Sequence, residues 1–375
     1  MLKINLKEIV KAPDDWSEIF DYSEDLDKLK DALKGIEAEK VILIGNGGSI
    51  TSYDAIYDAV EPEIPSATVW TMEPDYLANI KKEFPKDGTV VIAVSKSGKT
   101  LGLIEALLFF IDYEIICVTE PKSSPLYGMA QILGWKIIPH PAVGGRYSAG
   151  TSCCMVPSHL AKIEIKDIQD GITAGYELKD EAYSLAKYYF DLEEKGYSEV
   201  YLPIYSNRLR GFQNLIVQLM HESVCKDGKG QTFYAFFGPE AQHHTNQRFL
   251  GGKKNVIGTF ITVTKPENDL KIEVSDELKN IEYKGSKLDL LNGLPYQKAL
   301  EAEYIGTKED ADAKGVPNLT IELDSISTKS VAELISFWHL TAFYSSNLRG
   351  VNPFDQPTVE DSKNITLEVI KKLKL

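Results

Sequence analysis

The sequence predicts an α/β protein made of two doubly wound domains, each a mainly parallel sheet flanked by helices, followed by a C-terminal helical segment. Short apolar runs, such as residues 40–44 and 89–94, alternate with stretches of helical periodicity. Strands that are apolar along their whole length are typical of parallel sheets covered by helices on both faces. A chain of 375 residues is long enough for two such cores.

The first domain is expected at residues 31–175, after an N-terminal segment at 1–30 that we expect to form a helix packed on the outside. Its elements alternate, with strands at 40–44, 67–72, 89–94 and 114–118 and helices at 50–60, 75–84, 101–111 and 150–161. The stretch between residues 119 and 143 is expected to be a loop.

The second domain is expected at residues 176–348, and a loop and polar helix follow at 349–375. Its strands are expected at 200–204, 255–264 and 318–323, and its helices at 179–194, 208–225 and 330–344. Residues 266–315 are polar and weakly patterned, and only short strands and helices are expected there.

Composition narrows the class of protein. Lys and Arg number 41 against 55 Asp and Glu, which gives a net charge of −14 and no basic stripe for nucleic acid. A phosphorylated ligand would therefore need local donors such as backbone N–H groups, hydroxyls and a few cations. The four cysteines have no zinc-site spacing, and no apolar run is long enough for a membrane span. We therefore expect a soluble protein with reduced cysteines, located in the cytoplasm.

Two strand-to-helix turns in the first domain are candidate phosphate sites, because helix N-termini at the carboxyl edge of a doubly wound sheet attract anions. The turn at residues 45–49 has Ile50 where a dinucleotide-binding turn needs its third glycine. The turn at 95–100 has Ala93 where a P-loop needs its first glycine. Its hydroxyls suit a single phosphate monoester, and the alternative is simple helix capping.

The helix expected at residues 208–225 carries the candidate base. Its apolar residues recur every three or four positions, and Gln218 and Glu222 lie beside that buried stripe, four residues apart. Glu222 is placed to act as a general base. Taken alone, such a pair is more often a solvated surface feature.

Six segments, in order along nearly the whole chain, resemble the phosphoglucose isomerase family of the sugar isomerase domain superfamily. They are Gly47-Gly48-Ser49; Ser95-Lys96-Ser97 with Thr100; Gly144-Gly145-Arg146-Tyr147-Ser148; Gln218-Leu-x-x-Glu222-Ser223; Gln242-His243-x-x-x-Gln247; and Asn352-x-Phe354-Asp355-Gln356 with Lys363. Each motif is weak by itself, and the specificity comes from finding all six in the family's order.

The resemblance implies the following roles. Glu222 is the base, Arg146 stabilises the enediolate, and His243 and Lys363 assist ring opening. The substrate-binding residues are Gly48, Ser49, Ser95, Lys96, Ser97, Thr100, Gln218 and Gln356. The C-terminal loop and helix are expected to return to the active site. The resemblance also implies a homodimer in which the histidine comes from the neighbouring subunit. No cofactor or metal is expected, and the charge pattern and the length of the apolar runs argue against nucleic acid or a membrane as partner.

The sequence departs from the family's pattern at a few positions. Gly102 stands where relatives often carry a glutamate, and Met220-His221 replaces a Pro-Met pair before the base. His243 fits the motif's spacing, and His244 is the alternative. A metal cluster made of Glu240 and the two histidines is disfavoured, because no further ligand lies at a suitable spacing.

The expected activity is the reversible interconversion of glucose 6-phosphate and fructose 6-phosphate through a cis-enediol, a step of glycolysis and gluconeogenesis. One alternative is a wider enzyme that also accepts mannose 6-phosphate. The other is a sugar-phosphate-binding regulator without catalysis, which could dispense with Glu222, Arg146 and Lys363. All three are present, and no DNA-binding helix-turn-helix precedes the first strand.

Overall fold

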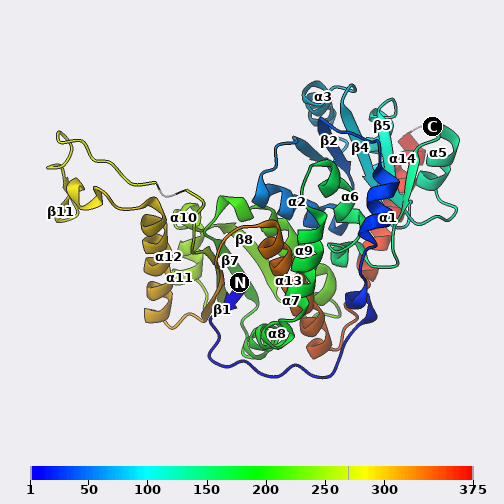
Figure 1. Cartoon of the computed structure of the whole chain (residues 1–375). Helices are drawn as coiled ribbons and strands as arrows, with labels where there is room; N and C mark the ends of the chain where they lie inside the picture. The colour runs from blue at the N-terminus through cyan, green and yellow to red at the C-terminus, as the bar shows by residue number, and fades with distance from the viewer. Residues whose placement is uncertain (1, 269, 374–375) are drawn as a thin grey trace.

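The computed structural model describes residues 2–268 and 270–373 as two layered α/β units that share one large apolar core (Figure 1). Each unit is built on a five-stranded sheet, and the predicted fold class is confirmed. Within these residues, no helix is both long enough and apolar enough to cross a membrane.

The first sheet is parallel throughout, in the order β3-β2-β4-β5-β6. Its strands are β2 (Lys40–Ile44), β3 (Ser66–Val69), β4 (Thr89–Val94), β5 (Glu114–Thr119) and β6 (Lys136–Pro139). The chain runs outward from β2 to β3 and then crosses back to β4, so the strand order reverses between β2 and β4. Ile44 pairs with Ala93, which places the turns after these two strands side by side at the carboxyl edge.

Helices cover both faces of this sheet because its strands are apolar on both sides. Val41 and Leu43 face the shared core, whereas Ile42 and Ile44 face a second core. The shared core is covered by α1 (Leu26–Leu33), α2 (Gly48–Val60) and α6 (Ser152–Leu160), and the second core by α3 (Pro74–Glu83), α4 (Leu101–Phe109) and α5 (Pro125–Leu133).

The second sheet has the order β1-β12-β9-β7-β8, and its strand order reverses between β7 and β9. Its strands are β1 (Leu2–Ile4), β7 (Glu199–Ile204), β8 (Thr232–Phe237), β9 (Val256–Val263) and β12 (Asn318–Leu323). Only β1 is antiparallel, paired with β12. The helices facing the shared core are α7 (Ile165–Tyr176), α8 (Lys179–Glu193), α9 (Gly211–Val224) and α13 (Thr328–Arg349), and those on the other face are α10 (Gly238–Ala241), α11 (Thr245–Gly251) and α12 (Tyr296–Ala313).

The two units meet along α2 and α9, which pack closely and run antiparallel. A side chain at Gly211, where α9 begins, would lie 2.5 Å from the Cα of Ala55. A side chain at Gly47, just before α2, would lie 2.5 Å from Nε2 of Gln218 near the middle of α9. The start of each helix therefore faces the middle of the other, and glycine at residue 211 permits the close approach.

A long arm, residues 270–295, projects from the second unit between β9 and α12 (Figure 1). It contains the small hairpin β10 (Glu282–Tyr283) and β11 (Ser286–Lys287), and a bridge between Lys271 and Pro295 closes its base. After α13 the chain continues through a loop to α14 (Glu360–Leu373), which is exposed along nearly its whole described length.

Several expectations about single elements are wrong. The stretch expected to be a loop contains α5 and β6, and the N-terminal segment supplies strand β1 and the start of α1 rather than an outer helix. The helices α7, α11 and α12 and the strand β8 were not expected. The domain boundaries near residues 30, 175 and 348 stay predictions, although β1 crosses the first of them by joining the second sheet.

Candidate active site

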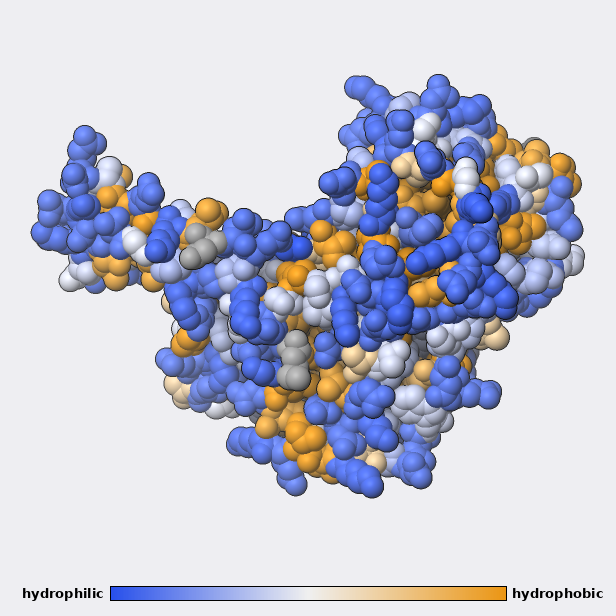
Figure 2. Space-filling model, viewed as in Figure 1, coloured by the Kyte–Doolittle hydropathy of each residue, from blue (hydrophilic) through white to orange (hydrophobic). Residues whose placement is uncertain are grey.

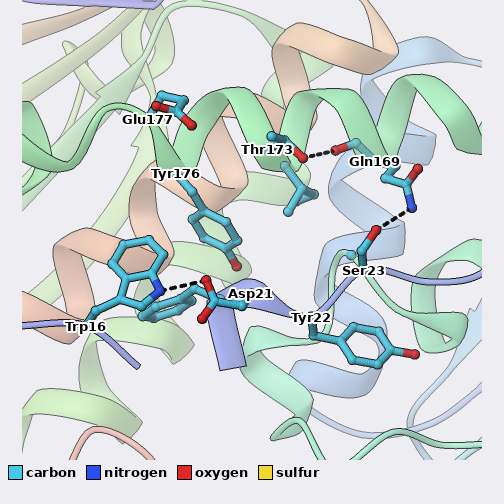
Figure 3. A pocket seen from close by; sticks show the side chains of 11 residues that line it. Trp16, Asp21, Tyr22, Ser23, Gln169, Thr173, Tyr176 and Glu177 are labelled. Carbon is cyan, nitrogen blue, oxygen red and sulfur yellow. Dashed lines mark hydrogen bonds between the residues drawn. The ribbon is translucent and has the colours of Figure 1, made fainter. Parts of the chain in front are cut away.

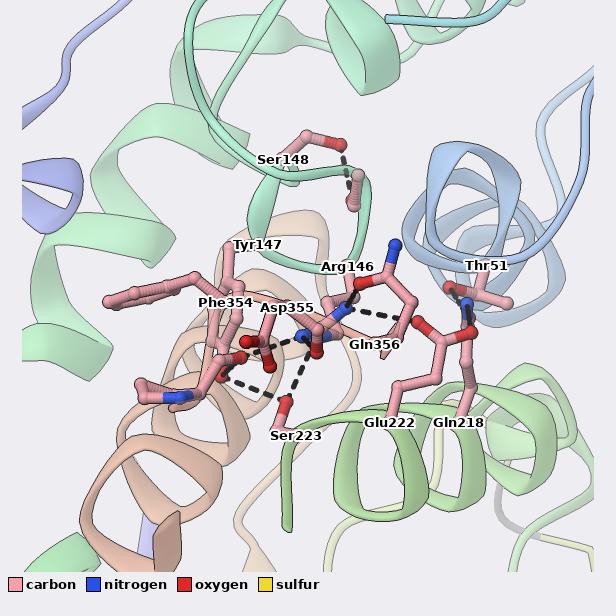
Figure 4. A network of polar contacts seen from close by, with 12 residues as sticks. Thr51, Arg146, Tyr147, Ser148, Gln218, Glu222, Ser223, Phe354, Asp355 and Gln356 are labelled. Atoms are coloured by element: carbon pink, nitrogen blue, oxygen red, sulfur yellow. Dashed lines mark hydrogen bonds and ion pairs between the residues drawn. The ribbon is translucent and has the colours of Figure 1, made fainter. Parts of the chain in front are cut away.

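Arg146 lies at the centre of a polar network at the junction of the two units (Figure 4). It sits in a 3-10 turn, Gly145–Tyr147, and only 6% of its side chain is exposed. Its guanidinium donates five hydrogen bonds: from Nε to Ser223 Oγ (2.9 Å), from Nη1 to Glu222 Oε2 (3.1 Å) and Gln356 Oε1 (2.7 Å), and from Nη2 to the carbonyls of Pro353 (2.7 Å) and Asp355 (2.9 Å). A fixed cation with this many acceptors cannot rotate freely, so its charge has a defined direction.

Glu222 lies in the last turn of α9 and is held from two sides. Its Oε2 accepts from Arg146, and its Oε1 accepts from Gln218 Nε2 at 3.1 Å. Thr51 of α2 in turn donates to Gln218 Oε1 at 3.3 Å. The carboxylate is 37% exposed, so it is oriented by neighbours and still open to a ligand. This arrangement suits a general base.

The start of α2 closes one side of this network. A side chain at Gly48 would lie 2.2 Å from the backbone nitrogen of Arg146, so only glycine fits there. Gly47 has φ of 56°, a left-handed conformation that favours glycine, and it lies against Gln218. Ser49 follows, close enough to Gly145 that an added Cβ there would lie 3.2 Å from its hydroxyl. The glycines thus bring the free N–H groups of a helix start next to Arg146.

The second candidate phosphate turn follows β4. Ser95 Oγ and Thr100 Oγ1 are 3.0 Å apart, and Ser97 Oγ accepts from the backbone N–H of Lys99 at 3.2 Å. The Lys96 ammonium donates to the carbonyl of Ala142 at 2.9 Å. Since β2 and β4 are neighbours, this turn and the Gly47–Ser49 turn share one edge of the first sheet. The structure therefore brings the hydroxyl-bearing candidates together at the switch between β2 and β4.

The loop after α13 supplies three of the acceptors of Arg146, and Lys226 anchors it. Lys226 Nζ donates to Asp355 Oδ1 at 2.8 Å and also to the carbonyl of Asn352. Its side chain is only 9% exposed. The hydrogen bond and charge of Lys226 lower the pKa of the Asp355 carboxyl. Gln356, expected in the pocket, is part of this loop.

Tyr147 packs behind the network and contacts Ser223 and Phe354. Its hydroxyl lies 3.0 Å from Ser223 Oγ, its ring packs edge-on against Phe354, and burial raises the pKa of its phenol.

A separate cavity of about 270 Å³ lies between the N-terminal segment and α7, lined by Trp16, Asp21 and Tyr176 among others (Figure 3). None of its described lining residues is a predicted site residue.

His243 and Lys363 lie apart from Arg146 in this chain. His243 is exposed between α10 and α11, beside a hollow of about 600 Å³ that α12 also lines. His244 is exposed too, with Nδ1 2.6 Å from Thr245 Oγ1. The Lys363 side chain is 60% exposed on α14 and pairs with Glu360 at 2.5 Å. The roles expected for these residues stay predictions.

Over residues 2–268 and 270–373, no group of three or more His, Cys, Asp or Glu side chains is arranged to hold a metal ion. The polar centre is instead a guanidinium, a carboxylate and amides.

Sequence reasoning missed several residues of the network: Thr51, Tyr147, Ser223, Lys226 and Asp355 were given no role. Ser223 and Tyr147 belong to the quoted motifs, so their positions beside Glu222 and Arg146 were a usable signal. Nothing in the sequence links Lys226 to Asp355, which lies 129 residues away.

Comparisons with known proteins agree with the resemblance. No protein-family model matches the chain. A probable glucose-6-phosphate isomerase of Haloarcula marismortui is 28% identical over 368 residues, covering 92% of this chain and 82% of that protein. Over most of its length the chain is similar to proteins named glucose-6-phosphate isomerase. The resemblance noted in the sequence is confirmed.

Solved structures extend the likeness to the fold. A hypothetical protein of Thermus thermophilus superposes with a TM-score of 0.84 at 25% identity, over 94% of this chain and 89% of that one. A glucose-6-phosphate isomerase of Chlamydia trachomatis superposes with a TM-score of 0.74 at 20% identity, over 90% of this chain and 71% of that one. Both likenesses span the two α/β units, so the fold is shared over nearly the whole chain.

Proposed function

We propose that this protein interconverts glucose 6-phosphate and fructose 6-phosphate through a cis-enediol, with Glu222 as the base. The observation that carries the proposal is the Glu222 carboxylate held 3.1 Å from the guanidinium of Arg146, next to the glycine-rich start of α2. The names of the relatives support the same reaction.

The chemical step follows from these two groups. In the open-chain aldose, Glu222 takes the proton from C2, and the electron pair left on carbon forms the C1–C2 double bond of an enediolate. The negative charge moves to the C1 oxygen, where Arg146 supplies a positive charge that does not vary with pH. Within the cis-enediolate the hydroxyl proton of the C2 oxygen passes to the C1 oxygen, and Glu222 returns the carbon-derived proton to C1. The C2 oxygen thereby becomes a carbonyl, and the ketose results.

The phosphate would lie at the edge where the two candidate turns meet. Ser49, Ser95, Ser97 and Thr100 supply hydroxyls, and Gly48 and the backbone of Lys96 supply N–H groups. In a chain of net charge −14, such local donors are needed to hold an anion. Gln218 and Gln356 would line the sugar-binding part of the pocket.

We further propose a homodimer in which His243 reaches the site of the neighbouring subunit, while Lys363 assists ring opening after movement of α14. Two features support a second copy. His243 is exposed between α10 and α11, which pack on the face of the second sheet opposite to α9. The arm carries apolar side chains on its surface (Figure 2). Ile281, Tyr283 and Leu290 are each about half exposed, and a partner surface would cover them.

We also propose a cytoplasmic location, which the four free cysteines suit.

The decisive test is to incubate the protein with fructose 6-phosphate and assay glucose 6-phosphate and mannose 6-phosphate separately. We expect glucose 6-phosphate to form, and mannose 6-phosphate in addition would favour the wider enzyme. Glu222→Gln should lower kcat by about two to four orders of magnitude with little change in KM. Glu194→Gln, at the end of α8, is the matched control. A Glu222→Gln enzyme with near wild-type turnover would rule out the base assignment.

Mixing variants tests the shared site. Glu222→Gln and His243→Ala are each expected to be weakly active alone. If sites are shared, a heterodimer holds one intact site, so random mixing should recover roughly a quarter of wild-type activity. Light scattering after size exclusion should give a dimer mass. A monomer, or no recovery from a re-equilibrated mixture, contradicts the shared site.

A further inference from the structure

The second sheet has its own crevice at the carboxyl ends of its strands. The crevice has a volume of about 570 Å³ and is lined by residues that directly follow β7 and β9, among them Ser206, Asn207 and Lys265. Ser325, just after β12, lines it as well. The strand order of this sheet reverses between β7 and β9, so the crevice lies at the topological switch.

Open α/β sheets bind ligands at this place, because helix starts and loops diverge there and leave a polar hollow. In the first sheet the equivalent switch, between β2 and β4, carries the proposed phosphate turns. The second switch is part of no role derived above. It lies at the far end of the α2–α9 pair: the Arg208 Nε, just before α9, donates to the carbonyl of Ala59, near the end of α2, at 2.6 Å.

The crevice offers donors suited to an anion. Arg208 and Lys265 line it from two different loops, and the hydroxyls of Ser206 and Ser325 and the amides of Asn207 and Gln297 lie around them. The Arg208 side chain is 27% exposed and fixed by its bond to Ala59, so its guanidinium is positioned before any ligand arrives. Arginine and hydroxyl groups are the usual partners of phosphate oxygens.

Both cations now face carboxylates. Arg208 Nη1 lies 2.6 Å from Glu267 Oε2, and Lys265 Nζ lies 2.9 Å from Asp324 Oδ2. Glu267 is 73% exposed and Lys265 is 70% exposed, and exposed ion pairs contribute little to stability. A phosphate with two negative charges can therefore displace the Glu267 carboxylate from Arg208.

We propose that this crevice is a second anion site, which binds a small phosphate monoester separately from the β2–β4 switch. Glu267 acts there as an internal competitor that occupies Arg208 when the ligand is absent. The proposal goes beyond the isomerase reaction and does not depend on it, because none of the residues named for the crevice belongs to the proposed catalytic machinery.

Titration calorimetry with glycerol 3-phosphate tests the proposal, with glycerol as the neutral probe. The Ser95→Ala, Thr100→Ala double variant should weaken the first site and leave one site per chain unchanged. In that background, Lys265→Gln should weaken binding at least about fivefold, and Glu267→Gln should tighten it by a similar factor. Lys298→Gln, which removes a nearby exposed lysine outside the crevice, is the matched control and should change nothing.

Lys265→Gln is expected to lower the affinity for glycerol 3-phosphate and Glu267→Gln to raise it, and these opposite changes make the outcome decisive. Both variants alter exposed side chains, so they are expected to fold as the parent does. Loss of all binding in the double variant, equal binding of glycerol, or no response to either crevice variant would overturn the proposal. Isomerase activity of the otherwise unaltered chain, measured in parallel, reports on the first site alone, so failure of one proposal is distinguishable from failure of the other.

Discussion

The two ends of the α2–α9 pair are built alike and carry different chemistry. At one end α2 begins, with glycines at residues 47 and 48, and α9 ends with Glu222 beside Arg146. At the other end α9 begins and α2 ends. There, Arg210 Nη2 pairs with Asp58 Oδ1 at 2.6 Å. The Asp58 side chain is 21% exposed, against 37% for Glu222, so the acid of the second end is less open to a ligand.

The difference shows what an antiparallel arrangement of two similar units can provide. At the first end, the start of α2 supplies free N–H donors from the first unit. The end of α9 supplies the carboxylate of Glu222 from the second unit. One end then combines an anion-binding turn with a base, which suits proton transfer in a phosphorylated sugar. The second end keeps the donors, but Asp58 is less open there and the exposed Glu267 pairs with Arg208, which suits binding without chemistry.

The largest effect that separates the two ends is expected for Arg146→Lys. A lysine cannot reproduce the five directed hydrogen bonds of Arg146, and its ammonium leaves part of the enediolate charge unmet. We expect kcat to fall by about two to three orders of magnitude with KM changed less than about threefold. Steady-state kinetics measure this, and Arg210→Lys at the other end should retain nearly full activity. Equal losses in both variants would contradict the contrast between the ends.

The middle of α2 should show a pH-dependent effect on stability. Burial raises the pKa of Asp54 to about 7, although its carboxylate accepts a 2.5 Å hydrogen bond from Thr68. In an unfolded chain the pKa of an aspartate is about 3.9. Between these values the unfolded chain releases a proton that the folded chain keeps, so stability falls as pH rises from about 4 to 7 and then levels off.

Asp54→Asn removes this dependence. At pH 8 the variant should be more stable than the parent by about 2–4 kcal/mol, whereas at pH 4 the two should agree within about 1 kcal/mol. Urea unfolding at both values measures the difference, with Asp87→Asn as an exposed control. A variant less stable at both pH values would mean that the folded protein needs the ionised carboxylate.

Much of the fold followed from the sequence, and the rest depended on distant contacts. The strands at residues 40–44 and 89–94 were placed correctly because each is a largely apolar run, and the strand at 318–323 because its apolar and polar residues alternate. β1 was missed because it has three residues and forms only by pairing with β12, more than 300 positions away. β6 was missed because, as an edge strand, it buries only part of its side chains.

The candidate site divides in the same way. Gln218 and Glu222 are four residues apart on one helix, so their contact was predictable. Arg146 lies 76 residues from Glu222 and 210 from Gln356, and no local pattern joins them. The resemblance supplied these three residues as a set, and the fold supplied the distances. For His243 and Lys363 the resemblance implied roles, but within the described chain neither is among the hydrogen-bond partners of Arg146.

A smaller effect is expected where the first end meets the phosphate. Ser95→Ala combined with Thr100→Ala removes two hydroxyls that lie 3.0 Å apart at the β4 turn. KM for fructose 6-phosphate should rise by about 10- to 100-fold while kcat changes less than about threefold, since these groups bind a part of the substrate that does not react. Thr71→Ala, a hydroxyl removed elsewhere on the first unit, is the control. An unchanged KM would place the phosphate elsewhere.

The smallest effect concerns the loop that completes the first end. Lys226 touches no predicted substrate group, but it holds Asp355 and Asn352, and the carbonyl of Asp355 accepts from Arg146. Lys226→Gln should lower kcat about three- to tenfold with KM nearly constant, because a looser loop orients Arg146 less well. Lys226→Arg, which keeps the charge, should restore most of the activity, whereas Lys229→Gln alters a neighbouring lysine bonded to the carbonyl of Arg349 instead. If Lys226→Gln raises KM and leaves kcat intact, the lysine acts on substrate binding and the proposed support of Arg146 is wrong.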